Sequence, residues 1–190
     1  MYLARHWLFT ICLLASSAAH AATDFYGTLL SGTYQPSESF ASMSYDGSDT
    51  VYNFTLNAFD LDTLFTTDAF IGAIAVDAAF QPTISNVTGD TVVSVSPGGG
   101  PGGGFDFRFD LTDGQTRLTA NETVSFTATF SDPVVLSANS FALHVQGLTD
   151  AQGGSAWYTT TPVPEPSTYG MLLAGLGLIG FLGRKRLNQH

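Results

Sequence analysis

Hydrophobic and polar residues alternate over short segments through most of the chain. Residues 105–110 alternate without a break, with three phenylalanines on one side and charged residues on the other. Residues 51–56 and 124–130 follow the same pattern or nearly so. Because successive side chains of a strand point to opposite faces, this pattern predicts half-buried β-strands. Further strands are expected at residues 25–33, 69–76, 83–87, 91–95, 141–146 and 156–160.

Polar turn segments separate these strands, and no window between them shows a sustained helical period. Asp-Gly, Gly-Asp and Gly-Gly pairs lie between the apolar segments, where they favour tight turns. The pattern predicts an all-β fold, a single antiparallel β-sandwich of the jelly-roll-like kind, over residues 22–162. Seven side chains are expected to point inward, namely Phe54, Phe105, Phe107, Phe109, Phe126, Phe130 and Leu143.

One segment breaks the alternation. Residues 96–104 contain six glycines and two prolines. The segment lacks the lysine and the following Ser or Thr of a phosphate-binding loop, so it is predicted to be a flexible hairpin loop between two strands.

The N-terminal end has the pattern of a secretory signal peptide. Arg5 precedes the apolar run Trp7–Ala15, and Ala19 and Ala21 supply small residues at the −3 and −1 positions of a cleavage site. Residues 1–21 are therefore expected to be removed after export.

Three features follow one another at the C-terminal end, residues 163–190. Val163, Pro164, Glu165 and Pro166 should stay extended, since the two prolines restrict the backbone and remove amide donors. The next stretch, about 168–183, is uncharged and predicts a transmembrane helix.

A basic cluster closes this tail. Arg184, Lys185 and Arg186 are expected to stop the helix in the membrane and, by the positive-inside rule, to keep the tail in the cytoplasm with the body outside.

This order of Pro-Glu-Pro, membrane-length helix and basic cluster resembles the PEP-CTERM sorting domain. The resemblance implies an exported protein of Gram-negative, exopolysaccharide-producing bacteria that is processed by exosortase, a membrane transpeptidase-like enzyme. It also implies the route: the inner membrane transiently, with the body in the periplasm, then the cell surface or extracellular matrix. A permanent anchor that nothing cleaves is the alternative interpretation of the same tail.

The charge of the body limits its partners. Residues 22–162 carry fifteen acidic residues against Arg108 and Arg117, a formal charge of −13, and contain no lysine. Such a surface repels phosphate backbones, so nucleic acid is not an expected partner. The single cysteine, Cys12, lies in the signal peptide, so the mature chain should form no disulfide and use no thiol.

Candidate chemistry in the body is sparse. Asp60, Asp62 and Asp68 are weak candidates for calcium ligands, as is the set Asp106, Asp110 and Asp113, because calcium takes six to eight oxygens. No other cofactor is expected. Paired carboxylates also serve in glycoside hydrolysis, but their separation is not readable from the sequence.

A histidine and several aromatic residues of the body are further candidates for a functional role. His144 lies in a strand-like segment without a nucleophile-elbow motif, so a structural role is favoured over a catalytic one. Trp157, Tyr158 and scattered tyrosines could line a sugar-binding face or cover the core, and covering the core is favoured.

The expected function is non-enzymatic: a surface or extracellular-matrix protein associated with exopolysaccharide and biofilm, with exosortase and the exopolysaccharide matrix as partners. A calcium-stabilised glycan-binding module and a small hydrolase stay open as alternatives.

Overall fold

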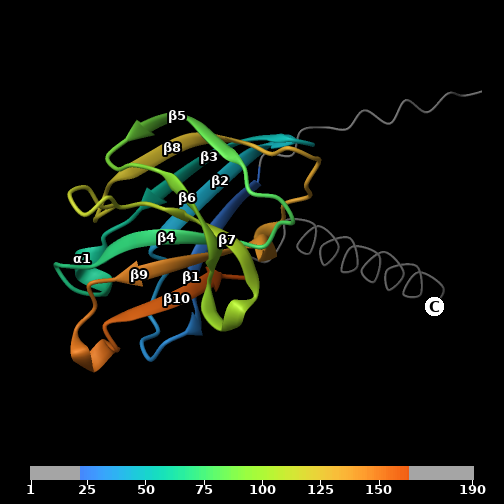
Figure 1. The fold of residues 1–190 in the computed structure, drawn as a ribbon. Helices are drawn as coiled ribbons and strands as arrows, with labels where there is room; N and C mark the ends of the chain where they lie inside the picture. The colour runs from blue at the N-terminus through green and yellow to red at the C-terminus, as the bar shows by residue number, and fades with distance from the viewer. Residues whose placement is uncertain (1–21, 163–190) are drawn as a thin grey trace, which may run out of the picture.

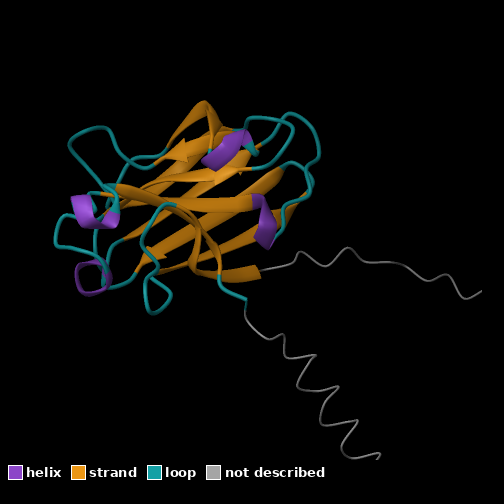
Figure 2. Cartoon of the chain, turned by 90° about the horizontal axis from the view of Figure 1, so that it is seen from below, coloured by secondary structure: helices purple, strands orange, loops and turns teal. Residues whose placement is uncertain are grey.

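The computed structural model describes residues 22–162, which form an almost entirely β domain (Figures 1 and 2). The strands are β1 Ala22–Ser31, β2 Ala41–Ser48, β3 Val51–Ala58, β4 Phe70–Val76, β5 Thr83–Gly89, β6 Ser94–Gly99, β7 Phe105–Asp110, β8 Thr123–Thr129, β9 Phe141–Gln146 and β10 Ser155–Thr160. The short helical turns are α1 Leu61–Leu64, η1 Pro101–Gly103, η2 Ala138–Ser140 and η3 Asp150–Gln152.

All ten strands belong to one antiparallel sheet, in the order β5-β8-β3-β2-β1-β10-β9-β4-β7-β6. The chain crosses repeatedly between the two halves of this order, since β4, β6, β7, β9 and β10 lie in one half and β5 and β8 in the other. In Figure 1 the half with β5, β8, β3 and β2 lies above the half with β4, β9 and β10. The two halves face each other as the layers of a sandwich do, so the all-β antiparallel prediction is confirmed.

Alternation along the strands builds the core between the two halves. Tyr52, Phe54 and Leu56 of β3 point inward, and the residues between them point outward. Phe54 packs against Phe126 of its own half and Phe109 of the opposite half, with ring centroids 5.1 and 5.7 Å away. The aromatic core therefore joins the halves directly.

Six of the seven side chains expected in the core are buried, and Phe105 is the exception. Phe105 is the first residue of β7, at the hairpin end, where its ring lies against Gly100 and is only half-buried. The core therefore does not extend to the first residue of β7, although the alternation predicted that it would.

Strand β2 was missed from the sequence. Its buried residues Ala41, Met43 and Tyr45 do alternate with serines, but they are followed by a turn-like Asp-Gly-Ser stretch. In the structure that stretch stays in the ladder, where Gly47 pairs with Tyr52, and β2 continues to Ser48.

The glycine-rich segment is partly strand instead of wholly loop. Strand β6 was expected at residues 91–95 but runs over Ser94–Gly99, with Pro97 paired to Phe107 and Gly99 to Phe105. Proline is tolerated there because β6 is an edge strand.

Several expectations fall outside the described residues. The predicted signal peptide, the 168–183 helix and the Pro-Glu-Pro segment all lie in residues 1–21 or 163–190. Within residues 22–162, no helix is both long and apolar enough to span a bilayer.

Candidate functional site

The outer face of the β10-β9-β4-β7-β6 half carries a trough whose floor is strand β4. One outward row crosses it, because Trp157 of β10 pairs with His144 of β9, His144 with Ala73 of β4, and Ala73 with Asp110 of β7. Ala73 carries only a methyl group between two rows of large side chains. We call this feature the outer-face trough; it is lined by Gly72, Ala73, Arg108, Asp110, Thr112, His144, Gln146 and Trp157 and holds about 380 Å³.

One wall is aromatic. The imidazole of His144 stacks on the indole of Trp157, with ring centroids 4.3 Å apart and planes within 5°. Both side chains are half-buried, while their sequence neighbours Leu143 and Tyr158 are fully buried in the core. Trp157 therefore belongs to the outer surface and Tyr158 to the interior.

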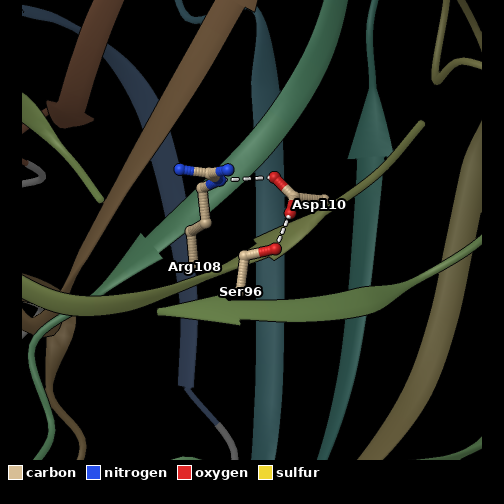
Figure 3. A network of polar contacts seen from close by, with 3 residues as sticks. All are labelled: Ser96, Arg108 and Asp110. Atoms are coloured by element: carbon tan, nitrogen blue, oxygen red, sulfur yellow. Dashed lines mark hydrogen bonds and ion pairs between the residues drawn. The ribbon is translucent and has the colours of Figure 1, made fainter. Parts of the chain in front are cut away.

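The opposite wall is polar. Arg108 Nε donates to Asp110 Oδ1 at 2.5 Å, and the Ser96 hydroxyl donates to Asp110 Oδ2 at 2.5 Å (Figure 3). Both oxygens of the carboxylate are thereby engaged, and the Asp110 charge is matched by that of Arg108. The wall presents a fixed set of donors and acceptors without excess charge.

A bulge in β4 shapes the floor. The register with β9 shifts between Ile71 and Ala73, at Gly72. A Cβ at Gly72 would collide with the side-chain oxygen of Gln146. With any other residue at this position, the flexible Gln146 side chain would have to move away from the floor.

His144 is neutral at physiological pH. Burial, and secondarily the positive charge of Arg108, lowers the pKa of His144 from 6.5 to about 4. In the opposite wall, Asp110 accepts hydrogen bonds from the Ser96 hydroxyl and from Arg108 Nε. His144 is therefore a weak base at pH 7 and forms no catalytic triad with Ser96 and Asp110.

The pKa of His144 should depend on the positive charge of Arg108. Replacing Arg108 with Met keeps most of the stem but removes the positive charge, so the pKa of His144 should rise from about 4 toward, but not to, 6.5, because burial remains. Arg117→Met is the matched control, since the Arg117 guanidinium lies over Phe70. NMR titration of the imidazole measures both variants; an unchanged pKa in Arg108→Met would show that the arginine charge does not reach the ring.

Two of the three proposed calcium ligands lie at the start of α1, and the third lies in the loop before β4. Asp60 is exposed and caps α1, accepting from the Thr63 amide and hydroxyl. Asp62 lies in the first turn of α1, and Asp68 is exposed in the loop before β4. Within residues 22–162, no three His, Cys, Asp or Glu side chains converge as a metal site.

The second acidic set is also dispersed. Asp106 is exposed, while Asp110 belongs to the trough wall. Asp113 accepts hydrogen bonds from the backbone amides of Thr116 and Gln115, and these lower the pKa of its carboxyl. Asp113 therefore stabilises a turn, and Asp110 forms an ion pair with Arg108.

A second cavity, of about 440 Å³, contains Asp68, Asp90, Arg117 and Glu122. Asp90 accepts from the Thr123 amide, and Glu122 accepts from the Thr119 amide. Two of the three carboxylates are thus used to hold loop backbone.

Asp24 of β1 is half-buried, and one of its carboxylate oxygens is inaccessible to solvent. Within the described residues, neither Asp24 Oδ2 nor the hydroxyl of fully buried Tyr26 has a hydrogen-bond partner. Burial raises the pKa of Asp24, with the Tyr45 hydroxyl as a partial compensation. The unpaired Asp24 oxygen and Tyr26 hydroxyl destabilise the fold locally. Neither of the cavities described above is lined by these residues.

Sequence reasoning singled out His144 and Trp157 separately but not the trough that they share. Arg108, Gln146 and Gly72 were missed as members of a site. The only signal was the small residues of β4, which have meaning only when the register places them between β9 and β7.

Comparison with protein families identifies a known motif at the C-terminal end of the chain. A family model described as the PEP-CTERM protein-sorting motif matches residues 162–186, a range that includes the Pro-Glu-Pro residues and the basic cluster. A comparison with curated proteins found no match to the chain. The resemblance noted in the sequence is therefore confirmed: residues 162–186 carry a PEP-CTERM protein-sorting motif, which implies export, sorting to the cell surface and an exosortase as processing partner.

Proposed function

We propose that the processed protein is a non-enzymatic component of the cell surface or extracellular matrix that associates with exopolysaccharide. The observation that carries this proposal is the sorting motif at residues 162–186, because it assigns the destination of the body. The body adds indirect support: its strong negative charge suits solubility in a hydrated matrix.

The proposed route has three steps. The signal peptide is removed near Ala21, and the body reaches the periplasm while the C-terminal helix holds it at the inner membrane. Exosortase then processes the chain near Pro164–Pro166 and releases the body to the surface. This route also makes the protein part of a biofilm wherever the exopolysaccharide forms one.

Co-sedimentation with exopolysaccharide isolated from the producing cells tests the proposal. We expect full-length protein to pellet with the polysaccharide and to stay in solution without it. The matched control is an unrelated exported protein fused to residues 163–190, which carries the same tail and should not pellet. If the fusion pellets equally well, or if the full-length protein stays in solution, the body does not associate with exopolysaccharide.

A further inference from the structure

We propose that the outer-face trough is a binding site for a neutral saccharide unit, with His144 and Trp157 as the aromatic wall and Arg108, Asp110 and Gln146 as the polar groups. The proposal rests on the proposed function and deepens it, because it names the surface and the class of sugar through which the protein would hold exopolysaccharide.

The spacing of the walls fits a flat ring. His144 and Asp110 lie on strands that flank β4, two strand spacings or about 10 Å apart. Between them β4 contributes only the small residues Gly72 and Ala73, and the Gln146 amide lies over Gly72. The gap of about 380 Å³ lies in the range of small-ligand pockets.

The chemistry of the walls matches the two kinds of surface on a sugar. The stacked pair His144–Trp157 offers rigid aromatic surface for the C–H groups of a sugar ring. Asp110 accepts one bond on each oxygen and retains further lone pairs, and Arg108 uses only its Nε on Asp110. Hydroxyl groups both donate and accept, so they suit this mixture of free donors and acceptors.

Charge favours a neutral sugar over an acidic one. The Arg108 charge is already compensated by Asp110, and His144 is uncharged at neutral pH. The surrounding body carries a formal charge of −13. A uronate or a sulfated sugar would therefore meet net repulsion and find no unmatched cation in the trough.

Two substitutions test the site: one adds a larger side chain to the floor, and the other removes a ring from the aromatic wall. Ala73→Leu places a larger side chain on the floor, at a position that is itself buried between the walls, and leaves the wall residues unchanged. His144→Ala removes half of the aromatic wall and leaves the core untouched. The matched control is Asn53→Leu, which adds a similar side chain at an exposed outward position of β3, in the other half of the sheet.

The probe is exopolysaccharide from the producing cells, cut to short oligosaccharides and separated by anion exchange into neutral and acidic fractions. Trp157 is the only tryptophan after residue 21, so the fluorescence of the processed protein reports directly on the trough. We expect the neutral fraction to shift this emission in a saturable way, with little change in affinity when salt is raised. Ala73→Leu and His144→Ala should each weaken binding by about tenfold or more, and Asn53→Leu by less than about twofold.

The outcomes separate this proposal from the proposed function. If wild-type protein binds the polysaccharide but Ala73→Leu and a folded His144→Ala bind equally well, the trough is not the site and the proposed function stands. If wild-type protein binds neither fraction, both fail. Preference for the acidic fraction with a steep loss in salt would overturn the neutral-sugar assignment, as would a wild-type dimer that Ala73→Leu converts to a monomer without any oligosaccharide binding.

Discussion

Replacing Phe54 with Ala is expected to lower the free energy of unfolding by about 3–5 kcal/mol, because a fully buried aromatic side chain is lost and its site cannot collapse completely. Five aromatic rings surround Phe54, with centroids 5.1–6.4 Å from its own: Tyr45, Tyr52, Phe109, Phe126 and Phe141. Two of these, Phe109 and Phe141, belong to the opposite half of the sheet. The substitution therefore opens the contact that holds the two halves together.

Urea unfolding of the processed protein measures this loss. Phe80→Ala is the matched control, since the same atoms are removed from a side chain that is 39% exposed in a loop, and it should cost less than about 1 kcal/mol. Equal losses in both variants would contradict the assignment of Phe54 to the centre of the core.

Replacing Pro164, Glu165 and Pro166 together with Ala is expected to leave the protein in the membrane fraction and nearly absent from the surface. Alanine lacks the fixed backbone angle of proline and favours a helix, so the substitutions should remove both the residues and the extended backbone that the sequence predicts for the proposed processing site. Fractionation of cells followed by immunoblotting measures the change, and the retained form should keep the mass of the unprocessed tail.

The control for this variant changes the same residue types elsewhere. Asp132→Ala with Pro133→Ala alters an exposed acid–proline pair in the loop after β8 and should leave sorting unchanged. If the wild-type surface protein itself retains residues 163–190, the tail is a permanent anchor and processing near Pro164–Pro166 is wrong.

Local patterns in the sequence were enough for several strands that have a neighbour on each side. The bounds of β7 and β9 agree with the predicted segments, because β9 buries one face along its whole length and β7 buries the same face except at Phe105. The C-terminal sorting motif was also readable, since its three features are contiguous in the chain and need no partner to be recognised.

The strand predictions were wrong where the residues of a segment do not favour a strand but the neighbouring strands hold the segment extended. Strand β2 is rich in serine and ends in a turn-like stretch, yet its place between β1 and β3 keeps it extended. Strand β6 uses Pro97 and Gly99, which no propensity scale assigns to a strand, because the edge of a sheet requires hydrogen bonds on only one side. Phe105 alternates perfectly but is only half-buried at the hairpin end of β7.

The sequence by itself determined the fold class, the inward side chains of most strands and the export and sorting of the chain, because each depends on residues close together along it. Only the tertiary structure decided the outer-face trough. Gly72, Arg108 and His144 are far apart in the chain, and their proximity depends on the strand order β9-β4-β7 and on a one-residue bulge. A shift of one residue in either register would turn these side chains to the other face of the sheet, and no periodicity specifies which register the strands choose.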